Sequence, residues 1–168
     1  MADQLEFDWQ LSGSGWATCR IADASAEAKY VVSYCTDPLA DLINGLAGMY
    51  RPEPVERVSF DLEPVEIRWV LRGVATGVEV SIYRFPDISA SFAAPDADGT
   101  LSWRTSQRRC SLVHAVVEAA QTVLREHGEA GYKARWVRFP FPAAALQRLR
   151  QLHLLDDKCD QLHDLSTP

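Results

Sequence analysis

Residues 67–83 read IRWVLRGVATGVEVSIY and contain two runs in which apolar side chains alternate with other residues. The first run, 67–72, is apolar at each odd position, and the second, 78–83, is apolar at each even position. A period of two is typical of a strand with one buried face. The connection between the runs, Gly73–Gly77, is too short for the crossover that parallel strands need, so we expect an antiparallel hairpin.

The same alternation on both sides of this hairpin predicts further strands, at 5–11, 16–21, 29–35, 57–62, 88–92 and 101–105. Apolar residues at helical spacing predict three helices, at 38–50, 111–127 and 143–155, with Pro38 suited to a first helical turn and Gly128 to a helix end. Residues 132–139 are expected to be extended or loop-like.

The element order is therefore βββ-α-ββββ(β)-α-α, which indicates an α+β fold. We expect a single twisted, mainly antiparallel sheet of about seven or eight strands with about three helices packed on one face. Residues 1–155 form the single domain in this interpretation. Residues 156–168 form an acidic C-terminal tail in which one more short helix can form.

Composition excludes several classes of protein. The chain has 168 residues, of which 47% are hydrophobic and 24% charged, as in an ordinary globular domain. No apolar run approaches the length of a membrane span. The N-terminal residues lack the pattern of a secretory signal, and the abundance of alanine and arginine fits a GC-rich gene, so we expect a bacterial cytoplasmic protein with reduced cysteines.

The charge distribution makes nucleic acid an unlikely partner. The net charge is −6, with 12 acidic and 4 basic residues in 1–66 and with 11 acidic and 13 basic residues in 67–168. A protein that binds DNA or RNA usually carries a basic excess, because neutralising phosphates supplies much of its affinity. This chain has none overall.

Two Cys-x-x-x-His units are the only metal-like motif. They are Cys110 with His114 and Cys159 with His163. On a helix, residues four apart share a face, so the two units together could form a Cys₂His₂ zinc site. However, 44 residues separate the units, and the close cysteine pairs of zinc knuckles are missing. We therefore expect the protein to bind no metal or cofactor. If it does bind a metal, these four residues are the candidate ligands.

The sequence marks no catalytic residues. It contains neither a Gly-x-Ser-x-Gly nucleophile elbow nor a His-Glu-x-x-His motif. The glycine-containing segment 12–15 lies between two expected strands, which favours a hairpin turn over a phosphate-binding loop. No role is assigned to His127 or His153.

Two groups of arginine and aromatic residues are candidate partner-binding surfaces, since these side chains are enriched at interfaces. The first group lies on the sheet face that the helices leave free: Arg68, Arg72, Tyr83 and Arg104. The second lies in the basic run 130–155: Arg135, Trp136 and Arg138. The alternative interpretation is a solvated surface whose charges are balanced by acids of the same chain.

The function predicted from these observations is that of a non-enzymatic protein-binding module, of the kind that serves as an immunity protein or inhibitor. Its partner would be another protein or a second copy of the chain. One alternative is a small-ligand binder or enzyme with a site assembled from scattered residues. Another is a self-associating structural protein.

Overall fold

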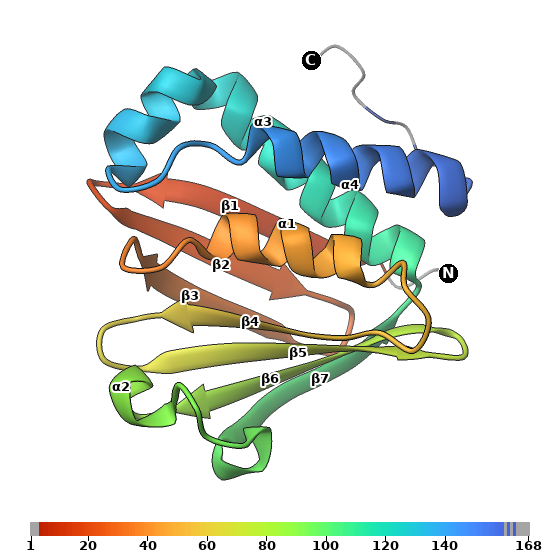
Figure 1. Ribbon diagram of the computed structural model, residues 1–168, viewed down its shortest axis with the longest axis horizontal. Coiled ribbons are helices and arrows are strands. Elements are labelled where there is room, and N and C mark those ends of the chain that lie inside the picture. Colours follow the sequence, from red (N-terminus) through yellow and green to blue (C-terminus); the bar gives the residue numbers. More distant parts are fainter. Residues whose placement is uncertain (1–3, 160, 162, 164–168) are drawn as a thin grey trace.

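A computed structural model describes residues 4–159, 161 and 163, and its architecture is α+β (Figure 1). The strands form two antiparallel sheets, one in the order β1-β2-β3 and one in the order β4-β5-β6-β7. Their bounds are β1 Glu6–Ser12, β2 Trp16–Ala22, β3 Glu27–Ser33, β4 Val55–Asp61, β5 Glu66–Val74, β6 Gly77–Phe85 and β7 Thr100–Gln107. The helices are α1 Pro38–Gly48, α2 Ile88–Ser91, α3 Arg109–Trp136 and α4 Ala143–Asp156, with a 3₁₀ turn at Asp96–Asp98.

The α+β class and the antiparallel pairing are confirmed, but the single sheet is wrong. β3 lies beside β4 (Figure 1), yet no backbone ladder joins the two strands in the described part of the chain. A side-chain contact is found there instead, in which Ser33 at the end of β3 donates a hydrogen bond to Glu63 just after β4. The alternating pattern fixes which face of a strand is buried, but it carries no information on which neighbours pair.

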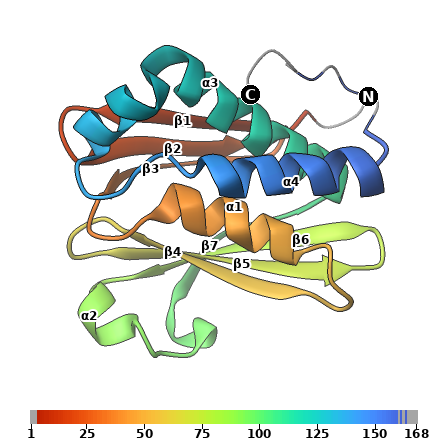
Figure 2. The same ribbon diagram turned by 45° about the horizontal axis from the view of Figure 1, so that its top comes forward.

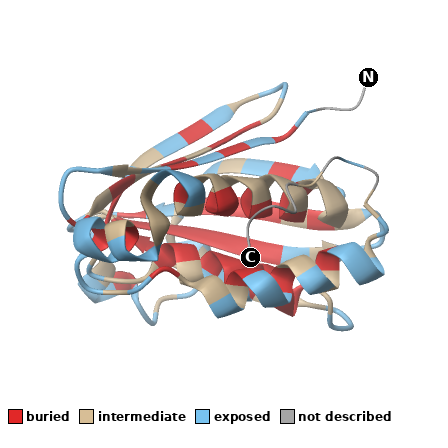
Figure 3. Ribbon diagram, turned by 90° about the horizontal axis from the view of Figure 1, so that it is seen from above, coloured by how far each residue is buried: buried red, intermediate tan, exposed pale blue. Residues whose placement is uncertain are grey.

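Helices α1, α3 and α4 pack together on the same side of the sheets, as Figures 1 and 2 show. Both sheets and these helices share one hydrophobic core, whose buried residues appear in red in Figure 3. Trp69 of β5 lies at its centre, with the Phe60 ring centroid at 5.3 Å and the Phe7 ring from the other sheet at 6.2 Å. The two sheets therefore stabilise each other through side chains. None of the described helices combines the length and apolarity needed to cross a bilayer.

Two local predictions are wrong. Residues 88–91 form helix α2 instead of a strand, because Asp87 caps the helix by accepting a hydrogen bond from the Ser89 amide at 2.9 Å. Residues 132–136 are helical as well. Gly128, with φ of 65° and ψ of 171°, ends the first helical segment of α3 as expected. A second helical segment follows, in which Tyr132 and Trp136, four residues apart, are both buried in the core.

The glycine loop of the first hairpin is a turn, as expected. Gly15 has φ of 77°, and a Cβ atom there would lie 2.5 Å from the ring of Tyr34. Strands β1 and β2 follow directly on both sides of this loop, so no helix N-terminus is present to hold a phosphate.

The carboxyl of Asp37, at the start of α1, gives the fold a specific pH dependence. Burial and the charge of Asp41 raise the pKa of Asp37 to about 6. The pKa of this carboxyl is lower in the unfolded chain than in the folded protein, so ionised Asp37 destabilises the fold. The destabilisation is complete above pH 6 and disappears as the pH falls towards 4. We expect Asp37→Asn to raise the free energy of unfolding at pH 7.5 by about 1–2 kcal/mol, a value reduced for partial solvent screening.

Urea denaturation at pH 7.5 and pH 4 measures this effect. Asn also caps helices well, so the substitution leaves the start of α1 intact. The exposed Asp98 supplies the control, since Asp98→Asn is expected to leave the stability unchanged at both pH values. An equal stabilisation by Asp37→Asn at pH 4 would refute the titration of this carboxyl as the cause.

Candidate metal centre

Three imidazoles and one thiol converge between α3 and the end of α4. His114 comes from α3, His153 from the last turn of α4, and Cys159 and His163 from the segment that follows. One donor atom from each of the four side chains lies within 4.8 Å of all the others. The rings are correspondingly close, with centroids 4.6 Å apart for His114 and His163 and 4.9 Å apart for His153 and His163.

The local fold explains this convergence. Helices α3 and α4 pack against each other, which places the rings of His114 and His153 5.9 Å apart. The chain leaves α4 at Asp156 and returns over α3, so that Cys159 Sγ lies 3.8 Å from His114 Nδ1. The packing of two helices thus supplies half of the site, and the following segment supplies the other half.

The spacing of the donor atoms suits a tetrahedral ion. Zinc bonds of about 2.0–2.1 Å to nitrogen and about 2.3 Å to sulfur place tetrahedral donor atoms about 3.3–3.7 Å apart. The observed sulfur–nitrogen distance of 3.8 Å is close to this range, and the largest separation in the set is 4.8 Å. Small side-chain rotations therefore suffice to close the four donors around one ion.

Two of the imidazoles carry a buried nitrogen with no hydrogen-bond partner among the described residues, His153 Nε2 and His163 Nε2. The His153 side chain is almost entirely removed from solvent. Burying a polar atom without a partner is costly, and such atoms are uncommon in native structures. A metal ion at the centre of the four side chains would satisfy both nitrogens.

A carboxylate holds His153 in the orientation that a metal ligand needs. Asp157 Oδ2 lies 2.9 Å from His153 Nδ1, so this nitrogen donates its proton to the carboxylate and the lone pair is on Nε2. Asp157 is itself fixed by hydrogen bonds from the Tyr50 hydroxyl at 2.6 Å and from Arg109 Nε at 2.8 Å. The arrangement is the carboxylate–histidine–metal relay that supports many zinc ligands.

The ionisation of these groups favours metal binding at neutral pH. Burial lowers the pKa of His114 and of His163, and the neighbouring imidazoles lower it further, so both rings are neutral with a free lone pair. Burial alone would raise the pKa of Asp157, but hydrogen bonds from Tyr50, His153 and Arg109 outweigh it and hold the pKa below its ordinary value. The supporting carboxylate is therefore ionised.

Removing this carboxylate charge provides a test of the relay. We expect Asp157→Asn to lower zinc affinity by about 10- to 100-fold, because His153 loses the acceptor that fixes its tautomer. Competition titration against a chromogenic chelator measures the affinity. Asp156→Asn, at the exposed neighbouring position, should leave it unchanged. Equal affinities of the two variants would argue against the relay.

The observed set differs from the sequence-based one at a single position. His114, Cys159 and His163 are brought together as the motif required, while His153 takes the place assigned to Cys110. Cys110 lies one helical turn before His114 and interacts with the Cys159 thiol. Burial and this contact raise the pKa of Cys110 to about 12, so its thiol keeps its proton at neutral pH.

The first predicted partner surface lies on the outer face of the four-stranded sheet. Arg68 pairs with Tyr83 across the β5–β6 ladder, and Ser81 pairs with Arg104 across β6–β7, which places these side chains on one face. Arg72 and Tyr83 line a surface hollow of about 630 Å³. Arg72 makes no hydrogen bond or ion pair with any described residue, and Arg104 donates to the Ser81 hydroxyl at 3.0 Å.

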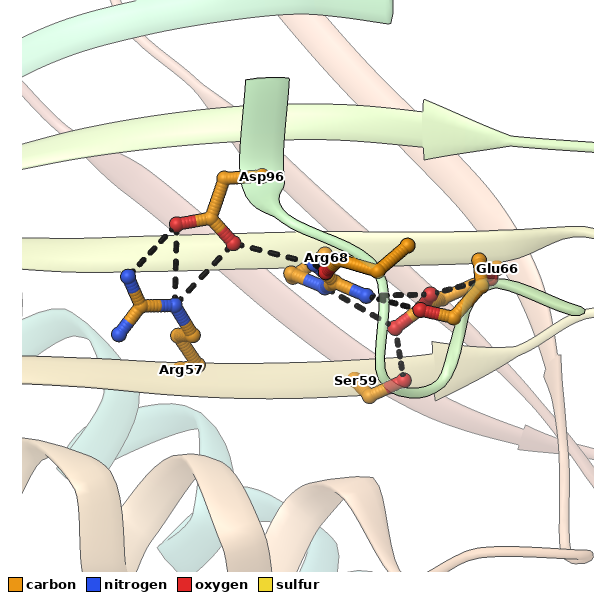
Figure 4. A network of polar contacts seen from close by, with 7 residues as sticks. Arg57, Ser59, Glu66, Arg68 and Asp96 are labelled. Carbon is orange, nitrogen blue, oxygen red and sulfur yellow. Dashed lines mark hydrogen bonds and ion pairs between the residues drawn. The ribbon is translucent and has the colours of Figure 1, made fainter. Parts of the chain in front are cut away.

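Arg68 does not belong to the accessible part of this face. Only 5% of it is exposed, because residues 86–99 cross over it. Its guanidinium contacts Glu66 at 3.0 Å and Asp96 at 3.1 Å (Figure 4). It also donates hydrogen bonds to the carbonyl oxygens of Ser91 and Ala94. The arginine binds a segment of its own chain, so its assignment as a partner contact is corrected.

The second predicted surface is divided by the helical extension of α3. Trp136 is fully buried, with its ring centroid 6.1 Å from that of Trp9, and cannot contact a partner. Arg135 and Arg138 remain exposed, and Arg138 donates a hydrogen bond to the carbonyl oxygen of Cys35 at 3.1 Å. The three residues are neighbours in the basic run of the sequence, but on the helix Trp136 faces the core while Arg135 faces solvent.

Comparison with known proteins gives no further guide. No family model matches the chain, no curated protein matches it, and no solved structure matches it. The function must therefore be inferred from the chemistry of the sites themselves.

Proposed function

We propose that this protein binds one Zn²⁺ ion through His114, His153, His163 and the thiolate of Cys159. The observation that carries the proposal is the pair of buried, unpartnered Nε2 atoms of His153 and His163, which lie beside a thiol and a third imidazole. Imidazole and thiolate donors suit zinc, whereas magnesium and calcium prefer oxygen donors.

The role of the ion in this proposal is structural. Four protein donors complete a tetrahedron and leave no coordination position for a substrate, which is typical of structural zinc sites. Two of the donors follow α4, so the ion would tie residues 157–163 to α3 and α4. Because unfolded chains rarely contain a preformed site, the free energy of metal binding would add to the stability of the fold.

Metal analysis of purified, tag-free protein tests the proposal. We expect one zinc per chain by mass spectrometric elemental analysis and a melting temperature that falls on chelation. Replacement by Co²⁺ should give the visible spectrum of a tetrahedral site with a thiolate-to-cobalt band, and Cys159→Ser should abolish that band. Substoichiometric zinc after reconstitution, or a melting temperature unaffected by chelation, would contradict the proposal.

As a second candidate function, the protein would bind another protein through the outer face of the four-stranded sheet. Immunity proteins and inhibitors are modules that act in this way. Its support is the hollow lined by Arg72 and Tyr83, together with Phe92 at its rim, which is 80% exposed. Exposed aromatic and arginine side chains are typical of binding hot spots. This function is compatible with a structural metal on the opposite side of the sheet.

The second function is tested by substituting residues on this face and measuring whether the bound partner is lost. A partner isolated with the wild-type protein should no longer bind Arg72→Glu or Phe92→Ser, while the matched variant Lys29→Glu, on the other sheet, should retain it. Retention of the partner by all three variants would exclude this face. Light scattering that shows a dimer, lost in the same two variants, would instead indicate self-association.

A further inference from the structure

We infer that Cys110 and Cys159 form a redox-active pair, and that peroxide converts them to a disulfide and thereby releases the metal. The inference depends on the proposed zinc site. It assigns a function to Cys110, the one residue of the two Cys-x-x-x-His units that the four donors leave unused.

The position of the two thiols carries the inference. Cys110 lies in the first turn of α3 and four residues before His114, so the two side chains share a helix face. The sulfur of Cys159 lies 3.8 Å from Nδ1 of His114, and the Cys159 thiol is close enough to Cys110 to raise the pKa of that thiol. The sulfur that would bind the metal is therefore next to a second thiol that would not. Cys159 itself lies outside regular secondary structure, so no helix or ladder opposes the approach of the two sulfurs.

Both thiols are partly exposed, so small oxidants can reach them from the surface. Cys110 lines a surface hollow of about 640 Å³, together with Arg108, Arg109 and Asp157. The other cysteines lack a thiol neighbour among the described residues. Cys19 is fully buried, and Cys35 is exposed with its thiol donating to a carboxylate oxygen of Glu63 at 3.0 Å. The chain thus has one thiol pair.

The chemistry proceeds in two steps with hydrogen peroxide as the oxidant. The Cys159 thiolate attacks one peroxide oxygen, the O–O bond breaks, and hydroxide leaves, which gives a sulfenic acid. The Cys110 sulfur then attacks the Cys159 sulfur, the S–O bond breaks, and the Cys110 proton leaves with the oxygen as water. In total, one thiol, one thiolate and one H₂O₂ give one disulfide, one water and one hydroxide. The two sulfurs lose two electrons and the peroxide oxygens gain them.

Disulfide formation removes the only thiolate from the site. A disulfide sulfur carries no charge and is not the form that binds metal. Three imidazoles then remain, and zinc affinity should fall by about 100-fold or more, the loss expected for one of four ligands. Reduction would regenerate the thiolate and restore binding.

The experiment measures zinc content and cross-linking in the same samples. The protein carries Cys35→Ser, so that the exposed thiol does not compete, and is compared with the same protein carrying Cys110→Ser as well. Each is loaded with zinc under reducing conditions, freed of reductant, treated with hydrogen peroxide and then treated with dithiothreitol. Elemental analysis gives the bound zinc, and peptide mapping by mass spectrometry identifies the linked cysteines.

We expect one zinc per chain before oxidation in both proteins, since Cys110 is not one of the four donors. Peroxide should link Cys110 to Cys159 and release the zinc, and dithiothreitol with added zinc should reload the site. With Cys110→Ser, no cross-link can form, so Cys159 should proceed to the sulfinic acid and the zinc should not return.

Two results separate the inference from the proposed function. If the reduced protein binds zinc but peroxide forms no Cys110–Cys159 disulfide, or forms it without zinc release, the inference is overturned and the zinc site stands. If the reduced protein binds no zinc, both are overturned.

Discussion

Replacing His153 with alanine is expected to lower zinc affinity by about 100- to 1,000-fold. Structural zinc sites contribute about 10–16 kcal/mol through four ligands, so one ligand accounts for about 3–4 kcal/mol. His153 is the donor whose loss should be most costly, because its ring is fully buried and its tautomer is fixed by Asp157. At the same zinc concentration, the zinc-dependent rise in melting temperature should therefore be clearly smaller than in the wild-type protein, because the stabilisation falls as Kd rises.

His127→Ala is the matched control for this substitution. His127 lies on α3 like His114, but it is not part of the four-residue set. The control variant should keep both the zinc stoichiometry and the zinc-dependent rise in melting temperature. Because removal of the buried His153 ring also leaves a cavity, the quantity to compare is the difference between zinc-bound and zinc-free protein. A full zinc-dependent rise in the His153→Ala protein would contradict the assignment.

The same site shows what sequence alone can predict about a metal centre. The two Cys-x-x-x-His units contain three of the four donors, because cysteine and histidine are the residue types that bind zinc. The helical spacing that suggested the site does not bring these donors together, since Cys110 is not a donor and Cys159 lies outside any helix. The sequence does not identify His153 because it belongs to neither Cys-x-x-x-His unit. Its local signal is Asp157, which follows four residues later at the end of α4 and holds the ring. A His-x-x-x-Asp pair of this kind lets the carboxylate hold the imidazole in place. It indicates a metal ligand only when the fold is known to bring other donor atoms close to the ring.

The fold shows the same division between local and tertiary information. Alternation correctly predicted six of the seven strands in the described part of the chain, and the strand-favouring residues of 29–35 predicted β3. It did not predict the break between β3 and β4, which depends on pairing between strands separated by α1. It also failed at 88–92, where the capping side chain of Asp87 outweighs the strand-like residues, and at 132–136, where helical spacing of Tyr132 and Trp136 was overlooked.

Replacing Arg68 with alanine is expected to lower the free energy of unfolding by about 3–5 kcal/mol, the cost typical of removing one partner from a buried ion pair. Glu66 is 1% exposed and would remain as an uncompensated charge beneath α2. The segment 86–99 would lose the guanidinium that binds Asp96 (Figure 4) and the carbonyl oxygens of Ser91 and Ala94. We therefore also expect faster amide hydrogen exchange in this segment than in the wild-type protein.

Urea denaturation with Arg72→Ala as the matched control measures this cost. Arg72 lies four residues further along β5 on the same face, but it is exposed, so its removal should change the stability by less than about 0.5 kcal/mol. The double substitution Glu66→Gln with Arg68→Met removes both charges and should recover much of the loss, because the cost comes from the unpaired carboxylate. If the Arg68→Ala protein proves as stable as the Arg72→Ala protein, the buried pair of Glu66 and Arg68 does not hold residues 86–99 on the sheet. In that case the outer face would be open along β5, and Arg68 would return to the residues available to a partner.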